Sequence, residues 1–475
     1  MPNPTSKRSL TAVVLAAGKG KRLRSSTPKV LHPLCGRPAL WWTIQNALVA
    51  KPQRIVIVVH HGADRVREEV ASWGIRPEPV FVEQGEPLGT GHAVLAAESA
   101  VGRVDEVLVT GGDFDPVTPE HMRELLRVHR RTRSAGTILT TEVEEPGGYG
   151  RVVRDGTRLQ QIVEGFDAPP ELKAQKEVSL LVFAFRRADL YRALPLVGRE
   201  NSQHEYYLNE VFPILMDKGE RISAVKVDVG GVMGINSRAD LARSVRIVRE
   251  RINDRHLANG VTLVDPDTTY IDVDVRIGAD SVILPNTHLE GSTRIGVGCE
   301  IGPSTRIVDS RIDDETSVTF AVVRGARIGR GSDVGPYVSI RPGTVLGEGA
   351  KAGTFVEIKN SKVGRGSKVP HLSYVGDADI GAEVNIGAAN VFANYDGYEK
   401  HRTSIGDGAR TGSDTILVAP VRLGKGAVTG AGSVITKDVP PGALAVERSD
   451  QRIVKGYRKR KDDEARARRE GRGAH

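Results

Sequence analysis

A small aliphatic residue recurs at every sixth position through most of the second half of the chain, and this repeat constrains the fold more than any other feature. A six-residue period with one inward aliphatic side chain and frequent glycine turns is typical of a parallel β-helix, in which three repeats make one triangular coil. The repeat positions are Ile277, Ile283, Leu289, Ile295, Ile301, Ile307, Ile328, Val334, Ile340, Leu346, Ala352, Val363, Val369, Val375, Ile380, Ile386, Ile405, Thr411, Leu417, Leu423, Thr429 and Ile435.

The repeat loses its register at residues 308–327 and 393–404, and the second break contains NYDGYEKHRT. Loops that project from a repeat array often form its binding face, so we expect such loops at both breaks. A single β-helix has flat sides and no natural pocket. We therefore expect copies of the chain to associate side by side.

The first 235 or so residues carry a different pattern, in which short β-branched segments alternate with longer amphipathic ones. This alternation predicts a largely parallel sheet with crossover helices. Helical spacing of apolar residues then predicts a helix that begins at Ser237 and stops at Gly260. The expected strands are TAVVLAA, RIVIVV, EVLVTG, GTILTTEV, VSLLVFAF and ISAVKV, and the helix aligns Leu241, Val245, Val248, Ile252 and Leu257.

Composition and charge narrow the classes of function. The formal charge is +8, but residues 451–475 hold ten Lys or Arg against four Asp or Glu, so the remainder is nearly neutral. This balance favours an enzyme-like body with a solvated basic tail over a nucleic-acid-binding surface. The sequence contains no run of 18 apolar residues, so we expect no membrane span. Cys35 and Cys299 cannot form a disulfide framework, which favours a cytoplasmic protein.

A glycine-rich segment follows the first expected strand, LAAGKGKRLRSSTPKVLHPLCGRP. Backbone N–H groups near Gly18 and Gly20 can approach a phosphate, and Arg22 and Lys29 add positive charge. The segment resembles the signature of nucleotide-diphosphate-sugar pyrophosphorylases, in which a sugar 1-phosphate attacks the α-phosphorus of a nucleoside triphosphate. Arg22 and Lys29 would then neutralise the converging phosphates.

A second segment, QGEPLGTGHA, resembles the uracil-recognition stretch of the uridylyltransferases in that superfamily. The resemblance implies that Gln84, Gly89 and Thr90 lie near the base, with Leu15 also in contact with the nucleotide. It therefore favours UTP over other nucleotides.

From about Ala12 to Arg460 the chain resembles the family of bifunctional N-acetylglucosamine-1-phosphate uridylyltransferases/glucosamine-1-phosphate acetyltransferases. The resemblance implies an α/β plus β fold: a Rossmann-like nucleotidyltransferase domain at 8–235, a linker helix at 236–260, a left-handed parallel β-helix at 261–440, and a C-terminal segment and basic tail at 441–475. It also implies a homotrimer with acetyltransferase sites between subunits.

The same resemblance implies a Mg²⁺ site at Asp113 and Asn236, and a sugar site at Gly150, Glu164, Ser179 and Asn236. Oxygen ligands of this kind suit Mg²⁺, which keeps several waters. The chain departs from the family at four places in its first half. Lys21 stands where the family usually has Thr, Gly111 precedes GD, the GDFDP loop is one residue longer, and Ser179 replaces an Asn that contacts the sugar.

The segment from Arg341 to Arg402 follows the family's acetyltransferase motif closely. An amine that is protonated in water must lose a proton before it attacks a thioester, and the resemblance implies His371 as the base. Glu357 would orient His371 or the substrate. The resemblance further assigns Arg341, Lys359, Tyr374, Asn385 and Lys400 to the amino-sugar phosphate, and Ala388, Asn394, Tyr395, Ser413, Ala431 and Arg448 to acetyl-CoA.

The sequence therefore predicts a cytoplasmic transferase that acetylates glucosamine 1-phosphate with acetyl-CoA and then transfers uridylyl from UTP, a step in the supply of cell-wall precursor. One alternative is an acetyltransferase whose first domain is impaired or retargeted, because the departures lie there. A second is a non-catalytic assembly scaffold, and a third is a glucose-1-phosphate or mannose-1-phosphate pyrophosphorylase. The His371 motifs disfavour the last two.

Overall fold

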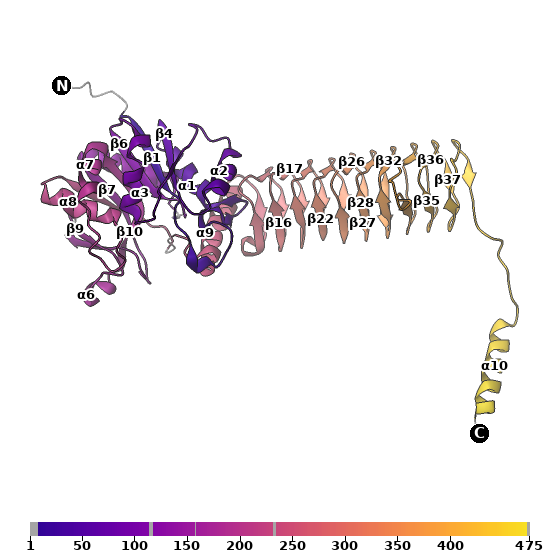
Figure 1. Cartoon of the computed structure of the whole chain (residues 1–475). Helices are drawn as coiled ribbons and strands as arrows, with labels where there is room; N and C mark the ends of the chain where they lie inside the picture. The colour runs from indigo at the N-terminus through magenta and orange to yellow at the C-terminus, as the bar shows by residue number, and fades with distance from the viewer. Residues whose placement is uncertain (1–7, 114–116, 157, 231–233, 473–475) are drawn as a thin grey trace. The chain divides into compact units, whose positions relative to one another are not determined.

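The computed structural model describes residues 8–113, 117–156, 158–230 and 234–472 (Figure 1). It divides into two compact units. The first contains Met1–Ala258 and Tyr270–Val275, and the second contains Asn259–Thr269 and Arg276–His475.

A twisted sheet forms the centre of the first unit, with the strand order β11-β7-β10-β6-β1-β4-β5. Every neighbouring pair is parallel except those that involve β10, which runs antiparallel to β6 and β7. The hairpin β8–β9 adjoins β10. The strands are β1 (Leu10–Leu15), β4 (Arg54–Val59), β5 (Val80–Glu83), β6 (Glu106–Gly111), β7 (Gly136–Glu142), β8 (Arg151–Asp155), β9 (Arg158–Val163), β10 (Glu177–Arg186) and β11 (Ile222–Lys226).

All six strands that the sequence predicts for this unit are present, as β1, β4, β6, β7, β10 and β11. The segments β5, β8 and β9 were not predicted. Val80–Glu83 is short, and in the β8–β9 hairpin charged and polar residues limit the β-branched residues to adjacent pairs, so neither segment gives a long β-branched run. Two further short strands, β2 (Pro33–Leu34) and β3 (Arg37–Pro38), pair with each other.

Helices cover both faces of this sheet. On one face, Val13, Val56 and Phe183 pack in a core with Val94 of α3 and Phe212 of α8. On the other face, alternate strand residues pack against α1, α2 and α5 in two further cores. The helices are α1 (Ala39–Leu48), α2 (Ala63–Ala71), α3 (Thr90–Ala96), α4 (Glu98–Val101), α5 (Pro119–Thr132), α6 (Pro170–Lys173), α7 (Arg187–Ala193), α8 (Val211–Asp217) and α9 (Arg238–Ala258).

The helix predicted between Ser237 and Gly260 is α9, and it belongs to the first unit. Val248 and Ile252 are buried as its spacing predicts, whereas Leu257 near its end is exposed. The polar residues Ser244 and Asn253 share its buried face. The apolar spacing identified the helix but only part of the face that it buries.

Three parallel sheets wind around the second unit as the sides of a left-handed β-helix (Figure 1). The first side is β12 (Thr262–Leu263), β15 (Val282–Ile283), β18 (Glu300–Ile301), β21 (Ser317–Val318), β24 (Asp333–Val334), β27 (Lys351–Thr354) and β30 (Lys368–His371). The second is β13 (Thr269–Ile271), β16 (Thr287–Glu290), β19 (Arg306–Val308), β22 (Ala321–Arg324), β25 (Val338–Ile340), β28 (Glu357–Lys359), β31 (Tyr374–Gly376), β33 (Val391–Ala393), β35 (Ile416–Val418) and β38 (Val434–Ile435).

The third side is β14 (Arg276–Ile277), β17 (Arg294–Ile295), β20 (Arg311–Ile312), β23 (Arg327–Ile328), β26 (Val345–Leu346), β29 (Lys362–Val363), β32 (Ala378–Ile380), β34 (Thr403–Ile405) and β36 (Val421–Leu423). A final pair is β37 (Val428–Thr429) and β39 (Leu444–Ala445). Residues three repeats apart are register partners, as Ile283 and Ile301 are, so one coil consumes three hexapeptides. Every predicted repeat residue is buried except Ile277, which is half-buried near the start.

The expectation of a projecting loop at 308–327 is wrong. This segment contains β20, β21 and β22, and the coil continues through it. Ile312 and Ile328 are register partners although they are 16 residues apart, so the coil has lost residues at its corners and has not gained a loop. The second break does form an excursion, because Asn394–Arg402 lies between β33 and β34 with most of its side chains exposed.

The basic tail ends in the helix α10 (Tyr457–Arg472), and its described side chains are almost all exposed. This exposure matches the solvated basic tail that the charge distribution predicts, and the structure adds the helix. Among the residues that the structure describes, no helix is both long enough and apolar enough to cross a membrane.

Candidate active sites

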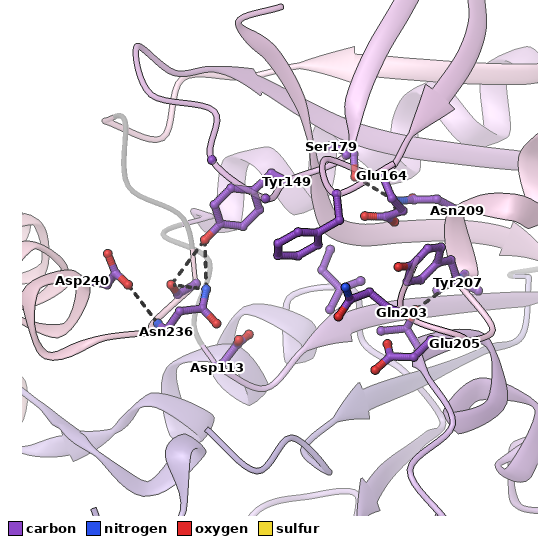
Figure 2. A pocket seen from close by; sticks show the side chains of 18 of the residues that line it. Asp113, Tyr149, Glu164, Ser179, Gln203, Glu205, Tyr207, Asn209, Asn236 and Asp240 are labelled. Atoms are coloured by element: carbon purple, nitrogen blue, oxygen red, sulfur yellow. Dashed lines mark hydrogen bonds between the residues drawn. The ribbon is translucent and has the colours of Figure 1, made fainter. Parts of the chain in front are cut away.

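The first unit contains a cavity of about 690 Å³ into which residues from many elements point (Figure 2). Eight of the residues predicted for the nucleotide and sugar site line it: Arg22, Lys29, Thr90, Asp113, Gly150, Glu164, Ser179 and Asn236. Leu15, Gly18, Gln84 and Gly89 are outside its lining. The structure therefore brings together residues that are up to 214 positions apart in the sequence.

One end of the cavity is organised around the ammonium group of Lys29. Its Nζ donates a hydrogen bond to Oδ1 of Asn236 at 2.8 Å and forms an ion pair with Asp113. Asn236 is held from its other side, because its Nδ2 donates to the hydroxyl of Tyr149 at 3.1 Å. Two oxygen ligands of the type that Mg²⁺ prefers thus converge on a single cationic group.

The glycine-rich loop allows this arrangement. Gly20 has a φ of +61°, and a Cβ at this position would lie 2.8 Å from Cβ of Lys29. Any other residue would be strained by the backbone and would also displace Lys29. Leu15 contributes through its backbone, since its carbonyl accepts from the N–H of Gly112 and so anchors the residue before Asp113. The side chain of Lys21 and the loop residues Phe114–Pro116 lie outside the described residues.

The segment expected to recognise uracil forms a compact turn. Nε2 of Gln84 donates to the carbonyl of Gly89 at 3.0 Å, which brings the two ends of the segment together. A Cβ on Gly89 would lie 2.7 Å from the carbonyl oxygen of Tyr206, so only glycine fits there. Thr90 lines the cavity, and its hydroxyl accepts from the N–H of Leu208 at 3.0 Å.

The other end of the cavity is lined by Glu164, Ser179 and Asn209 (Figure 2). Gly150 lies beside them, since a Cβ there would be 3.1 Å from Nδ2 of Asn209. Nδ2 of Asn209 donates to Oε1 of Glu164 at 2.6 Å and to the hydroxyl of Ser179 at 3.4 Å. Burial raises the pKa of Glu164 to about 7, despite the opposing hydrogen bond from Asn209. This carboxyl group therefore changes its charge within the physiological pH range.

Gly111, one of the departures from the family pattern, has a clear packing role. A Cβ there would lie 2.9 Å from Oδ1 of Asp113 and 3.0 Å from Cδ2 of Leu181. Leu181 itself lines the cavity. The absence of a side chain at position 111 therefore gives room to both Asp113 and Leu181.

In the second unit, several residues predicted for the amino-sugar phosphate lie on consecutive coils. Glu357 and Tyr374 are register partners on β28 and β31, and Nη1 of Arg341 donates to Oε1 of Glu357 at 2.8 Å. The adjacent ammonium of Lys359 lowers the pKa of Lys400. This concentration of positive charge on an exposed face suits a phosphate group.

A polar network supports these side chains. Nδ2 of Asn394 donates to Oδ2 of the buried Asp377 at 2.5 Å. Burial opposes ionisation of Asp377, but hydrogen bonds from Asn360 and Asn394 hold its pKa below the usual value. A Cβ on Gly376 would lie 2.5 Å from the hydroxyl of Tyr374 and 2.6 Å from Nδ2 of Asn394, so that glycine leaves room for both.

His371 ends β30, on the neighbouring side of the β-helix, and it is exposed. The corner residue Leu372 separates it from Tyr374 and has a φ of +50°. Asn385 lies on the next coil, where it forms a parallel β-bridge with Lys368. Lys368 belongs to β30, the strand that His371 ends. The structure thus places His371 and Asn385 across one corner from the Glu357–Tyr374 pair.

Three of the six residues predicted for acetyl-CoA, Ala388, Ser413 and Ala431, occupy equivalent places on successive coils. A Cβ on Gly387 would lie 2.7 Å from the backbone nitrogen of Ser413, and one on Gly412 would lie 2.4 Å from that of Ala431. Ala388 directly follows the first of these glycines. Nη1 of Arg448 donates to the carbonyl of Ala431 at 3.0 Å. Tyr395, in the exposed excursion, pairs with Lys400 through a β-bridge.

Sequence reasoning missed two residues that shape the first cavity, Tyr149 and Asn209. Tyr149 could have been found, because it stands beside Gly150 in the GYGR segment. Asn209 carries no motif signal, and only the fold brings it beside Glu164. Within the described ranges no three His, Cys, Asp or Glu side chains gather to hold a metal ion, so Mg²⁺ would depend on Asp113, Asn236, substrate oxygens and water.

Fold and cavity together define a nucleotidyltransferase joined to a hexapeptide-repeat β-helix, and comparison with known proteins agrees. A family model described as nucleotidyl transferase matches residues 11–232. "Bifunctional protein GlmU" of Streptomyces avermitilis is 46% identical over 459 residues, which cover 96% of this chain and 95% of that protein. The proteins of the same name from Mycobacterium tuberculosis (45% identical, 95% and 92% covered) and Thermoanaerobacter pseudethanolicus (43%, 94% and 97%) are similarly related.

The chain belongs to the GlmU family of bifunctional transferases. Its two activities are those expected from the sequence, acetyl transfer and uridylyl transfer in the synthesis of UDP-N-acetylglucosamine. The relatives align along both units of the chain. This disfavours the three alternatives, namely a protein with acetyltransferase activity alone, a non-catalytic scaffold and a hexose-1-phosphate pyrophosphorylase.

Proposed function

We propose that the two activities are divided between the two units: the cavity of the first unit carries uridylyl transfer, and the β-helix carries acetyl transfer. The observation that best supports this division is the composition of the cavity. Its Lys29 end gathers cationic and metal-ligating groups suited to a triphosphate, and its Glu164 end gathers neutral and acidic hydrogen-bonding groups suited to a sugar.

In uridylyl transfer, the phosphate oxygen of N-acetylglucosamine 1-phosphate attacks the α-phosphorus of UTP, and pyrophosphate leaves. Arg22 and Lys29 would neutralise the charge that gathers as the two phosphates approach. Gln84, Gly89 and Thr90 orient the uracil, and Glu164 and Ser179 orient the sugar. Mg²⁺ fits Asp113 and Asn236, whose oxygen atoms face the same ammonium group, and when bound it would supply further charge neutralisation.

In acetyl transfer, His371 would take a proton from the 2-amino group of glucosamine 1-phosphate as the nitrogen attacks the thioester carbon of acetyl-CoA. The carbon–sulfur bond then breaks, and the coenzyme leaves as its thiol after it recovers the proton. Arg341, Lys359 and Lys400 would bind the sugar phosphate. Tyr374 and Asn385 would position the sugar, and the ladder of Ala388, Ser413 and Ala431 would carry the coenzyme along the flank. The exposure of His371 is consistent with a site that a neighbouring subunit completes.

An apolar stack on the surface of the β-helix supports assembly as a homotrimer. Phe320, Tyr337 and Phe355 stack on successive corners, with ring centroids 5.6 and 5.3 Å apart. Leu372 occupies the next corner, and the last three of these side chains are 57–61% exposed. An exposed apolar stripe of this kind favours a protein interface. Since Leu372 directly follows His371, a partner on this stripe would lie beside the candidate base.

The activities are tested by two assays on the purified protein. Pyrophosphate release is measured with UTP, N-acetylglucosamine 1-phosphate and Mg²⁺, and thiol release with acetyl-CoA and glucosamine 1-phosphate. We expect both signals, and thiol release alone would mean that Gly111, Lys21 and Ser179 have impaired or retargeted the first unit. The two free cysteines, Cys35 and Cys299, suit a reducing compartment, which supports the cytoplasm as the expected location.

The trimer is tested by light scattering on the double variant Tyr337→Ser/Phe355→Ser. We expect this variant to dissociate and to lose acetyl transfer while it keeps uridylyl transfer. The control Val297→Ser removes a comparably exposed apolar side chain from another part of the β-helix and should remain trimeric. A monomeric wild-type protein with full acetyltransferase activity would contradict the proposal.

A further inference from the structure

Ser179 stands where the family has an asparagine that contacts the sugar, so this chain lacks an amide at that point. A serine hydroxyl can donate and accept a hydrogen bond, but its side chain is shorter than that of asparagine and reaches less far into the cavity. The cavity nevertheless contains an asparagine in contact with this serine. Nδ2 of Asn209 lies 3.4 Å from the hydroxyl of Ser179, although the two residues come from different elements, η4 (Leu208–Glu210) and β10.

Asn209 lies beside three of the four residues that the resemblance assigns to the sugar, Gly150, Glu164 and Ser179. Its Nδ2 donates to Glu164 at 2.6 Å, and a Cβ on Gly150 would lie 3.1 Å from the same nitrogen. Asn209 itself is only 6% exposed, and it lines the cavity. Its amide thus reaches the sugar end of the cavity from the opposite wall.

The hydrogen bond to Glu164 also fixes which way the amide faces. In the structure Nδ2 is the amide atom that faces Oε1 of Glu164, the arrangement in which an ionised carboxylate accepts the hydrogen bond. The other amide atom, Oδ1, is buried and has no hydrogen-bond partner among the described residues. Buried polar atoms are rarely left in this state in folded proteins, and a bound ligand is one way to satisfy them.

The backbone that carries Asn209 is held firmly in place. The N–H of Leu208 donates to the hydroxyl of Thr90 at 3.0 Å, and the carbonyl of Tyr206 accepts from the N–H of Gly91 at 2.7 Å. The segment is therefore tied to the N-terminal turn of α3 (Thr90–Ala96). A rigid support of this kind is what a specificity-determining side chain requires.

We propose that Asn209 is a sugar-specificity residue of the uridylyltransferase site, and that its Oδ1 accepts a hydrogen bond from the N–H or a hydroxyl of N-acetylglucosamine 1-phosphate. Asn209 and Ser179 together perform the task that the family gives to the asparagine at position 179. The inference rests on the proposed sugar site. It explains how the chain can keep sugar recognition despite its departure at Ser179.

The first test is Asn209→Ala, assayed by pyrophosphate release. We expect the KM for N-acetylglucosamine 1-phosphate to rise about 10- to 100-fold, because the substrate group is left unpaired in a closed site. The KM for UTP should change less than about twofold, since Asn209 lies at the sugar end. Asn46→Ala is the matched control. It removes from α1 an amide that donates to the carbonyl of Val117 and lies outside the cavity lining, so both KM values should remain unchanged.

The acetyltransferase activity of the same preparation is the control that shows whether the variant protein is folded. The more conservative Asn209→Ser provides a second variant in case alanine at this position prevents folding. Combining it with Ser179→Asn moves the amide back to the position that it has in the family. We expect the exchanged double variant to recover at least about tenfold in kcat/KM for the sugar phosphate over Asn209→Ser, the size of one restored hydrogen bond.

A second comparison separates direct contact from an effect through Glu164. In a Glu164→Gln background, Asn209→Ala should still raise the KM for the sugar phosphate. If it no longer does, Asn209 acts only by holding Glu164, and the proposal is overturned. An unchanged KM in Asn209→Ala with intact acetyl transfer overturns it equally.

Direct binding distinguishes this inference from the proposed function. UDP-N-acetylglucosamine and UTP are each titrated into wild type and Asn209→Ala. A selective loss of affinity for UDP-N-acetylglucosamine supports the role of Asn209 even in a protein that shows no turnover. Absence of turnover with tight binding of both ligands to wild type would contradict the proposed function alone, whereas equal affinities in wild type and variant would overturn the inference.

Discussion

Nζ of Lys29 donates a 2.8 Å hydrogen bond to Oδ1 of Asn236, across 207 positions of sequence. The contact joins the end of the glycine-rich loop to the residues that precede α9. Asp113, at the end of β6, pairs with the same ammonium group. The ammonium group of Lys29 therefore links three elements at the phosphate end of the cavity: the glycine-rich loop, the end of β6 and the segment before α9.

Replacing this lysine should affect one activity only. We expect Lys29→Ala to lower kcat for uridylyl transfer about 10²- to 10³-fold, the usual effect of losing one positioned charge-stabilising donor. Acetyl transfer should be unchanged, because its residues belong to the second unit. The two assays on one preparation measure both effects, and Lys218→Ala, which removes an exposed lysine after α8, is the control. Equal loss of both activities would contradict two separate sites.

The glycine-rich loop offers a test that separates backbone strain from displacement of Lys29. Gly20 and Gly74 have nearly the same φ, +61° and +62°, but a Cβ would meet Lys29 at Gly20 and open space at Gly74. Alanine at either position should cost about 1–2 kcal/mol of unfolding free energy, because both backbones are left-handed. Only Gly20→Ala should also lower uridylyl transfer.

Unfolding of the first unit can be followed by tryptophan fluorescence, since the three tryptophans, Trp41, Trp42 and Trp73, all lie there. Loss of stability without loss of activity in Gly20→Ala would show that the loop can shift and leave Lys29 in place. Loss of activity in Gly74→Ala would show that strain alone is sufficient. Either result would separate the position of Lys29 from the requirement for glycine.

The sequence predicted the elements better than their junctions. The hexapeptide phase identified the inward residues because each coil repeats one packing environment, and six β-branched runs located six strands of the first sheet. The hexapeptide phase gave a wrong prediction at 308–327, where the coil is shorter. Periodicity cannot distinguish a missing corner residue from an inserted loop.

Residues of the candidate site divide in the same way. Lys29, Asp113 and Asn236 were identifiable because each stands in a recognisable segment, and the structure brings them together. Asn209 was not identifiable, because its contacts in the cavity are with Glu164 and Ser179, which are 45 and 30 positions away in the sequence. Contacts over such separations leave no local pattern in the sequence.

Burial of Glu164 predicts a pH dependence of stability. Its pKa is about 7 in the folded protein against the ordinary 4.5, so the folded state holds this proton more tightly than the unfolded state does. The contribution of Glu164 to the free energy of unfolding therefore falls as pH rises from about 4.5 to about 7, and it is constant above that range. Glu164→Gln, which stays neutral, should gain stability relative to wild type across this window.

The measurement is denaturant unfolding followed by tryptophan fluorescence at pH 5 and pH 8. The difference between Glu164→Gln and wild type should be larger at pH 8, and a difference that does not change with pH would contradict the assignment. Catalysis gives a second readout. If the carboxylate accepts hydrogen bonds from the sugar, kcat/KM for the sugar phosphate rises with pH through about 7 in wild type, and this rise is absent in Glu164→Gln.

Removal of the imidazole of His371 tests the chemistry of the second unit. We expect His371→Ala to lower kcat for acetyl transfer about 10²- to 10⁴-fold, the range for loss of a general base, with little change in the KM for either substrate. Uridylyl transfer should be unaffected. His288→Ala, which removes a histidine from β16 near the start of the β-helix, is the matched control.

The pH profile distinguishes a base from a residue that only supports the corner at Leu372. If His371 takes the proton from the amine, the pH profile of the variant differs from that of wild type, because its residual rate rises with pH as more substrate amine becomes deprotonated in solution. A structural role predicts a lower rate with an unchanged profile. An unchanged profile in a trimeric His371→Ala protein would therefore reject His371 as the base, and the proton would have to leave by another group or by water.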